Sequence, residues 1–162
     1  MARPAKTNLD YFPLDVNFSQ DPKIMAISAE FGLPGEYFIL QLYSHIYRTK
    51  GYFITWNKLN KPIFQRYFKD HFSAEQIDSI IEHAVEYELF DRELFEQHQV
   101  LTSTAIQSRY VTATEQRVVD YDSLEYWLID WKSVNGSKRR KSMKVNNPGN
   151  TTKEIIEKES IE

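Results

Sequence analysis

Residues 73–87, SAEQIDSIIEHAVEY, carry the strongest helical pattern in the chain. Ser73 and Gln76 have the spacing of a capping box, in which each side chain binds a free backbone N–H group of the first turn. Apolar side chains recur at helical spacing on one face, at Ile77, Ile80, Ile81, Ala84 and Val85. The opposite face carries Glu75, Asp78, Glu82 and Glu86. We therefore predict a helix from Ser73 to about Tyr87 with a buried face and an acidic outer face.

Two short apolar runs follow this helix and predict a pair of strands. Leu89–Asp91 and Val100–Thr102 flank a turn region around Arg92, so we expect them to form a small hairpin. Ser103 then has the position of an N-cap for a last helix. Beyond that helix, Tyr126–Ile129 is a short apolar patch between acidic residues.

Two helices are predicted on the N-terminal side. Asp21–Pro22 has the form of an N-cap followed by proline in the first turn, and Gly32 is expected to end this short helix. A second helix is expected from near Pro34 to Lys50–Gly51, which supplies a basic last turn and a C-terminal cap.

A strand and a third helix fill the interval before residue 73. Tyr52–Trp56 is rich in β-branched and aromatic residues, which is typical of a strand. Asn57 or Asn60 is expected to cap the third helix, in which Pro62 is tolerated only in the first turn. Its apolar residues are Ile63, Phe64, Tyr67 and Phe68.

Helix, strand, helix, helix and hairpin is the element order of a winged helix, a variant of the helix-turn-helix class. The sequence therefore predicts a mainly α fold with a small β-sheet, a winged helix with extra N- and C-terminal helices. We expect residues 1–131 to form this domain together with an N-terminal arm. Residues 132–162 are rich in asparagine, serine and lysine without periodicity, so we expect a disordered basic tail.

The composition indicates in which cellular compartment the protein acts. The 162 residues contain no cysteine, so stability must come from packing, as is usual in a reducing cytosol. Neither a secretion signal nor an apolar run long enough to span a membrane is present. We therefore expect the cytoplasm of a bacterial cell and no membrane association.

Charges are sorted along the chain. Between Glu36 and Asp70 there are six basic residues and no acidic one. From Asp70 through Asp130 there are fourteen acidic residues and three basic ones. Residues 132–150 are basic again. The chain thus presents a basic, an acidic and a basic segment in order.

Several spaced motifs resemble a known family. The opening segments Ala2–Pro4, Lys6 and Leu9–Val16 are similar to the N-terminal domains of phage and prophage replication proteins. Further motifs of this kind are Gly51–Tyr52, Leu89–Asp91, Leu101–Ser103, Ile106–Gln107 and Arg109–Tyr110. The resemblance covers roughly residues 2–115. It implies a winged-helix domain similar to the amino-terminal part of DnaD-like replisome organisers and replication initiators, acting in DNA replication.

The acidic helix is unsuited to the usual docking of a winged helix on DNA, because phosphates repel its carboxylates. We expect basic residues elsewhere to bind nucleic acid. In the folded domain they are Arg48, Lys50, Lys58, Lys61, Arg66 and Lys69. The arm adds Arg3 and Lys6, and the tail adds Lys138, Arg139, Arg140 and Lys141. For each group of basic residues, the alternative is a solvated surface that binds no ligand. The aromatic residues in the same stretch, Tyr52, Trp56 and Tyr67, are expected to lie in the core.

Two functions remain open at this point. In the first, the domain binds single- or double-stranded DNA with little sequence specificity, as a module of a phage or mobile-element replication initiation protein. In the second, it is a protein-protein interaction module that self-associates or binds a host replication protein such as a helicase loader. The residues for the second role are Glu75, Asp78, Glu82 and Glu86, whose alternative is an ordinary solvated helix face.

Catalysis has little support in the sequence. None of the five glycines lies in a phosphate-binding loop pattern. The four histidines are far apart, and the usual zinc spacings cannot be built without cysteine. We therefore expect no enzyme activity, no metal site and no cofactor.

Overall fold

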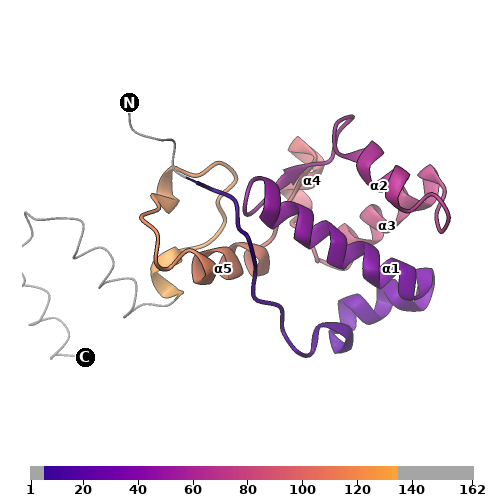
Figure 1. Cartoon of the computed structure of the whole chain (residues 1–162), viewed down its shortest axis with the longest axis horizontal. Coiled ribbons are helices and arrows are strands. Elements are labelled where there is room, and N and C mark those ends of the chain that lie inside the picture. The colour runs from indigo at the N-terminus through magenta and orange to yellow at the C-terminus, as the bar shows by residue number, and fades with distance from the viewer. Residues whose placement is uncertain (1–5, 135–162) are drawn as a thin grey trace, which may run out of the picture.

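The computed structural model describes residues 6–134, and this part of the chain is mainly helical with a small sheet, as predicted (Figure 1). The helices are α1 (Pro22–Thr49), α2 (Lys61–Tyr67), α3 (Ala74–Glu86), α4 (Arg92–His98) and α5 (Thr104–Ala113). The strands are β1 (Ile54–Thr55) and β2 (Val100–Leu101). Short 3-10 turns lie at Phe18–Gln20, Tyr121–Ser123 and Trp131–Ser133.

Helix α1 contains the two predicted N-terminal helices joined across a kink. Asp21 caps its start, because its carboxylate accepts a hydrogen bond of 2.9 Å from the Lys23 backbone N–H. Gly32 has φ 74°, a left-handed conformation that glycine adopts without a steric cost. The predicted break at Gly32 is confirmed, although the chain resumes its helix at once.

The sheet differs from the predicted hairpin. β1 pairs antiparallel with β2, with Ile54 opposite Leu101 and Thr55 opposite Val100. The prediction of a strand at Leu89–Asp91 was wrong, because Asp91 caps helix α4 by accepting a hydrogen bond of 2.9 Å from the Leu94 N–H. Helix α4 therefore occupies the interval in which the turn of a wing was expected.

The predicted caps of α3 and α5 are confirmed, whereas Asn60 precedes α2 without a side-chain capping bond. Ser73 and Gln76 form both bonds of the capping box, at 3.2 and 2.9 Å, and α3 buries the five apolar residues named for it. Pro62 lies in the first turn of α2. Ser103 caps α5 by accepting a hydrogen bond of 3.2 Å from the Ile106 N–H.

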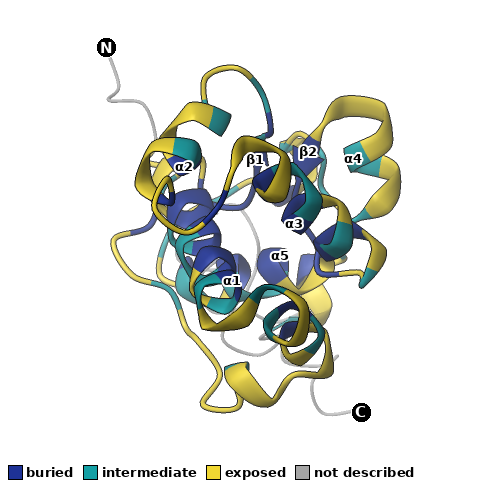
Figure 2. Ribbon diagram, turned by 90° about the vertical axis from the view of Figure 1, so that its right-hand side faces the viewer, coloured by how far each residue is buried: buried dark blue, intermediate teal, exposed yellow. Residues whose placement is uncertain are grey.

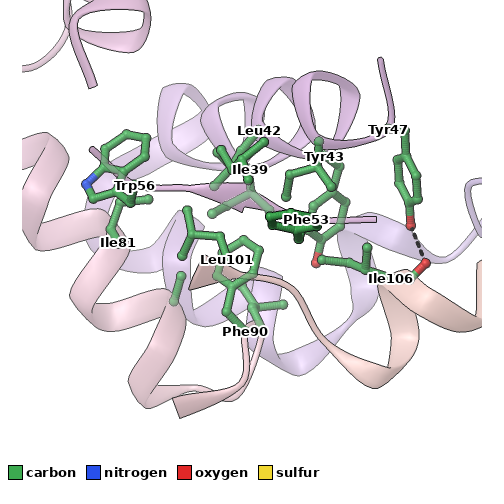
Figure 3. Close-up of a cluster of buried hydrophobic side chains, with 14 of the residues drawn as sticks. Ile39, Leu42, Tyr43, Tyr47, Phe53, Trp56, Ile81, Phe90, Leu101 and Ile106 are labelled. Atoms are coloured by element: carbon green, nitrogen blue, oxygen red, sulfur yellow. Dashed lines mark hydrogen bonds between the residues drawn. The ribbon is translucent and has the colours of Figure 1, made fainter. Parts of the chain in front are cut away.

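The core lies between α1 and α3 and is closed by the sheet and α5 (Figure 3). Ile39, Leu42 and Ile81 are among its fully buried side chains. Burial of one such side chain stabilises the fold by about 1.5–3 kcal/mol. Figure 2 shows that the buried residues of α1, α3 and α5 face the interior, whereas the outer faces of α2 and α3 are largely exposed.

The segment after α5 returns to the same core. Tyr121 and Trp131 are buried, with ring centroids 5.4 Å apart. The Gln107 side chain accepts a hydrogen bond of 2.7 Å from the Leu128 N–H and donates one of 3.0 Å to the Tyr126 carbonyl. The apolar patch predicted at Tyr126–Ile129 is thus held against α5.

Candidate nucleic-acid interface

A groove of about 590 Å³ lies between the second half of α1 and α2. Its lining residues are Gln41, His45 and Arg48 from α1, and Ile63, Phe64, Arg66 and Tyr67 from α2. The three α1 residues are four and three positions apart, which places them on one stripe of the helix. The lining contains no acidic residue. Arg48 and Arg66, which the sequence predicted separately as nucleic-acid ligands, therefore line one groove.

A hydrogen-bonded chain fixes the position of Arg48. Its Nη2 donates to His45 Nδ1 at 3.0 Å, and because a guanidinium only donates, the histidine proton lies on Nε2. That Nε2–H donates to Asn60 Oδ1 at 3.1 Å. The Asn60 amide is oriented in turn by a bond of 2.7 Å to the Thr55 carbonyl on β1. The backbone of the sheet thus orients a cation of the groove lining through Asn60 and His45.

Two tyrosines extend the groove toward the kink of α1. Tyr67 is 59% exposed and Tyr37 is 43% exposed, so the prediction that Tyr67 belongs to the core was wrong. Tyr52 and Trp56 are buried as predicted. The two exposed hydroxyl groups share a hydrogen bond of 3.1 Å, which raises the pKa of Tyr67 above its ordinary value and keeps this hydroxyl protonated.

Lys61 does not join the groove. Its Nζ lies 3.4 Å from Asp78 Oδ1 on α3. A residue predicted to bind DNA is therefore paired with a residue predicted to bind a protein partner. Helical spacing puts Ile63, Arg66 and Tyr67 on the other side of α2 from Lys61. The α1–α2 groove and helix α3 therefore flank α2 on opposite sides.

The other three basic residues of this segment, Lys50, Lys58 and Lys69, are exposed and lie outside the groove lining. Ion pairs in the described part of the chain include none of them, nor Arg48 or Arg66. Their charges are therefore not neutralised by a carboxylate partner in the described part of the chain.

The acidic face of α3 is present as predicted, with one exception. Glu75, Glu82 and Glu86 are exposed to solvent. Asp78 is only half-buried but is engaged by Lys61 and by the Trp56 Nε1–H, which donates to it at 3.5 Å. The available partner-binding set is therefore three glutamates.

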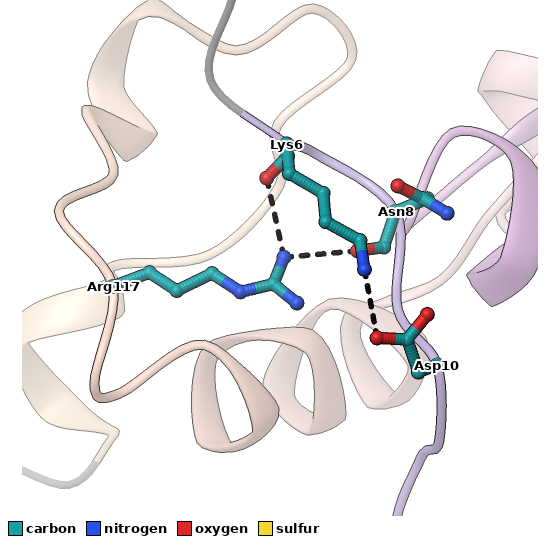
Figure 4. A network of polar contacts seen from close by, with 4 residues as sticks. All are labelled: Lys6, Asn8, Asp10 and Arg117. Carbon is teal, nitrogen blue, oxygen red and sulfur yellow. Dashed lines mark hydrogen bonds and ion pairs between the residues drawn. The ribbon is translucent and has the colours of Figure 1, made fainter.

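The N-terminal arm is bonded to the rest of the domain (Figure 4). Lys6, which was predicted to bind DNA, already forms an ion pair within the arm. Lys6 Nζ lies 2.7 Å from Asp10 Oδ2, and this lysine lowers the pKa of Asp10. Arg117 Nη1 donates to the carbonyls of Lys6 and Asn8 at 3.2 and 2.9 Å. The remaining residues that were predicted to bind nucleic acid lie outside the described part of the chain. They are Arg3 in the arm and Lys138, Arg139, Arg140 and Lys141 in the tail.

Gly51 is required where the arm crosses the end of α1. It has φ 99°, and a Cβ at this position would collide with the Thr7 carbonyl oxygen and the Tyr110 ring. The arm is further tied by a bond of 2.8 Å from the Leu9 N–H to the Tyr47 carbonyl. These contacts hold the first described residues of the arm against the end of α1.

Sequence reasoning missed Gln41, His45 and Asn60. The available signal was the spacing of Gln41, His45 and Arg48, which places three polar residues on one stripe of a helix whose other face is apolar. The pairing of this stripe with α2 depends on tertiary packing and has no local signature.

Neither a metal cluster nor a membrane-spanning helix is found within residues 6–134. This range contains no cluster of three or more His, Asp or Glu side chains arranged to hold a metal ion. Nor does it contain a helix with both the length and the apolar character that crossing a bilayer requires.

The fold and the groove together define a small, mainly helical domain with a cationic groove on one side of α2 and an acidic helix on the other. Residues 11–106 match the family model described as Lin1244/Lin1753-like, N-terminal, and the chain belongs to this family. It is 34% identical over 134 residues to the uncharacterized phage-related protein Lin1244/Lin1753 of Listeria innocua serovar 6a. The match covers 83% of this chain and 43% of that relative, so the chain spans less than half of its length. No solved structure matches the chain. The family is thus phage-associated.

Proposed function

We propose that this domain is a non-enzymatic DNA-binding module of a phage replication protein, acting inside the bacterial cell through the α1–α2 groove. The observation that carries the proposal is the position of Arg48 and Arg66 on two helices that line one groove without carboxylates. The replication setting is supported by the resemblance to DnaD-like replisome organisers and by the phage-related relative.

The electrostatics of the groove suit phosphate. Cations that neutralise phosphates release condensed counterions, which supplies most of the sequence-independent affinity for nucleic acid. Arg48 is held in place by His45, so less side-chain entropy is lost when a phosphate binds. Both guanidinium groups can bind a phosphate in a bidentate manner.

The proposal includes a winged-helix variant with an altered docking face. α1, β1, α2 and α3 follow in the order of that fold, and α4 takes the place of the wing hairpin. The helix that enters the major groove in most winged helices corresponds to α3, which presents Glu75, Glu82 and Glu86. Binding at α1–α2 keeps these carboxylates away from phosphates.

The test is fluorescence anisotropy with labelled oligonucleotides across about 50 to 200 mM salt. The double variant Arg48→Ala/Arg66→Ala is compared with Lys23→Ala/Arg92→Ala, which removes the same charge from exposed sites on the first turn of α1 and on α4. We expect at least about a tenfold loss of affinity for the groove variant. The slope of log K against log salt is expected to shrink by about 0.7–0.9 for each lost phosphate contact.

A shortened chain that ends at Val134 separates the groove from the basic tail. If the shortened chain keeps salt-dependent binding that the groove variant loses, the folded domain holds the site. The proposal would be contradicted if both double variants lost DNA affinity equally. It would also be contradicted if removal of residues 135–162 alone abolished DNA binding.

A second candidate function is protein binding by α3. Glu75, Glu82 and Glu86 are exposed, and the ion pairs of the described residues include none of them. A partner with a basic surface, a second copy included, would fit this face. Light scattering of the intact chain and of Glu75→Gln/Glu82→Gln/Glu86→Gln tests self-association, since only an α3-mediated oligomer dissociates in the variant.

A further inference from the structure

Apolar surface accompanies the cations of the α1–α2 groove. Tyr67 is 59% exposed, Ile63 is 47% exposed and Tyr37 is 43% exposed. Ile63 and Tyr67 are four residues apart and lie on the same side of α2. A surface that only attracts phosphates has no need of exposed rings, so the groove is suited to a ligand with both negative charge and flat apolar faces.

Buried Phe68 holds both tyrosine rings in place from below. Its ring lies 5.0 Å from Tyr67 and 6.1 Å from Tyr37, both in edge-to-face contact. The two tyrosine rings are 6.4 Å apart with an interplanar angle of 33°. The hydroxyl–hydroxyl bond between them fixes the pair further. Rings held in this way can present a face to a ligand with little loss of side-chain entropy.

We infer that the groove binds single-stranded nucleic acid, with a base stacked on Tyr67 and adjacent phosphates bound by Arg48 and Arg66. The inference rests on the proposed function and names its substrate. Exposed aromatic rings beside arginines are the means by which single strands are bound without sequence preference.

The geometry disfavours a duplex at this site for two reasons. Bases in a duplex stack on one another, so they offer no face to a tyrosine ring. A duplex laid across α2 would also bring its second strand toward the glutamates of α3, on the far flank marked by the Lys61–Asp78 pair. A single strand can follow the groove on the other flank.

The experiment measures affinity of the intact chain for three probes of about 15 nucleotides: oligothymidine, a duplex, and an abasic strand with the same phosphates but no bases. The variants are Tyr67→Ala and Tyr67→Phe, with Tyr11→Ala as the matched control, because Tyr11 is 79% exposed on the arm. Thermal unfolding of each variant checks the fold.

We expect oligothymidine to bind more tightly than the duplex and the abasic strand. Tyr67→Ala should lose about tenfold in affinity for oligothymidine and none for the abasic strand. Tyr67→Phe keeps the ring and its contact with Phe68 but loses the hydroxyl bond to Tyr37, so it should retain most of the affinity, whereas Tyr11→Ala should bind like the unmodified chain.

Three outcomes would overturn the inference. The inference fails if oligothymidine and the abasic strand bind equally well, or if the duplex binds best. The proposed function still stands in either case, provided that Arg48→Ala/Arg66→Ala weakens binding. If that arginine variant binds every probe like the unmodified chain, both fail together.

Discussion

Helices α2 and α3 are neighbours that use their outer faces in opposite ways. α3 buries every large aliphatic side chain it carries and presents glutamates to solvent. α2 buries Phe64 and leaves Ile63, Arg66 and Tyr67 exposed. Two amphipathic helices on one core thus differ in what they offer to a partner. An exposed face that retains apolar and aromatic side chains is the better indicator of a binding surface, because solvation alone favours polar residues there.

The two helices should differ most in how much an isoleucine on each contributes to stability. Ile80→Ala on α3 should lower the free energy of unfolding by about 3 kcal/mol, because Ile80 is fully buried and its loss leaves a cavity. Ile63→Ala on α2 should change it by less than about 1 kcal/mol, since Ile63 is 47% exposed. Urea unfolding followed by circular dichroism measures both. Equal losses would mean that Ile63 is a core residue and that the groove is not an open surface.

The second prediction concerns substitutions that change the outer face of α3 from acidic to basic. Glu75→Lys/Glu82→Lys/Glu86→Lys should raise affinity for a duplex by about tenfold, or about 1.4 kcal/mol, because the face that repelled phosphates now attracts them. Affinity for a single strand should rise less, since that ligand lies on the other flank of α2. Anisotropy with both probes gives the ratio. A duplex affinity that does not respond to this change would place α3 outside the electrostatic field of the bound DNA.

Local patterns were enough to predict most of the fold. The capping box at Ser73, the kink at Gly32 and the cap at Ser103 each depend on residues within one turn, so sequence spacing identified them. Helix α4 was missed because Leu89–Asp91 and Val100–Thr102 also satisfy a hairpin pattern. The decisive feature was Asp91, a capping residue for the seven residues Arg92–His98, which were read as a turn.

The groove was only partly predictable, for a different reason. Clustering of basic residues between Glu36 and Asp70 identified Arg48 and Arg66, yet Lys61 of the same cluster is paired with Asp78. Which lysine faces α3 depends on the rotation of α2 about its own axis. That rotation is set by packing of Phe64 and Phe68 on Phe38, a contact between distant segments.

The third prediction separates folding from binding on α3. Ser73→Ala removes the side-chain oxygen that accepts the Gln76 N–H and should destabilise the domain by about 1 kcal/mol. Affinity for a single strand should be unchanged at temperatures where both proteins are folded. Thermal unfolding and anisotropy on the same samples measure the two quantities. A parallel loss of affinity would show that the capping end of α3 contributes to the binding surface.

The smallest effect is expected where the two helices meet. Asp78→Asn keeps an oxygen that can accept the Trp56 N–H but removes the charge that pairs with Lys61. Both members of this pair are more than a third exposed, so the change in stability should stay within about 0.5 kcal/mol. Released Lys61 adds to the positive field of α2, and single-strand affinity should rise about twofold. Asp10→Asn releases Lys6 in the same chemical way on the arm and controls for loss of a negative charge alone. If both variants gain equally, net charge explains the gain; if only Asp78→Asn gains, α3 acts on the groove through this pair, and the acidic helix limits how strongly its neighbour binds.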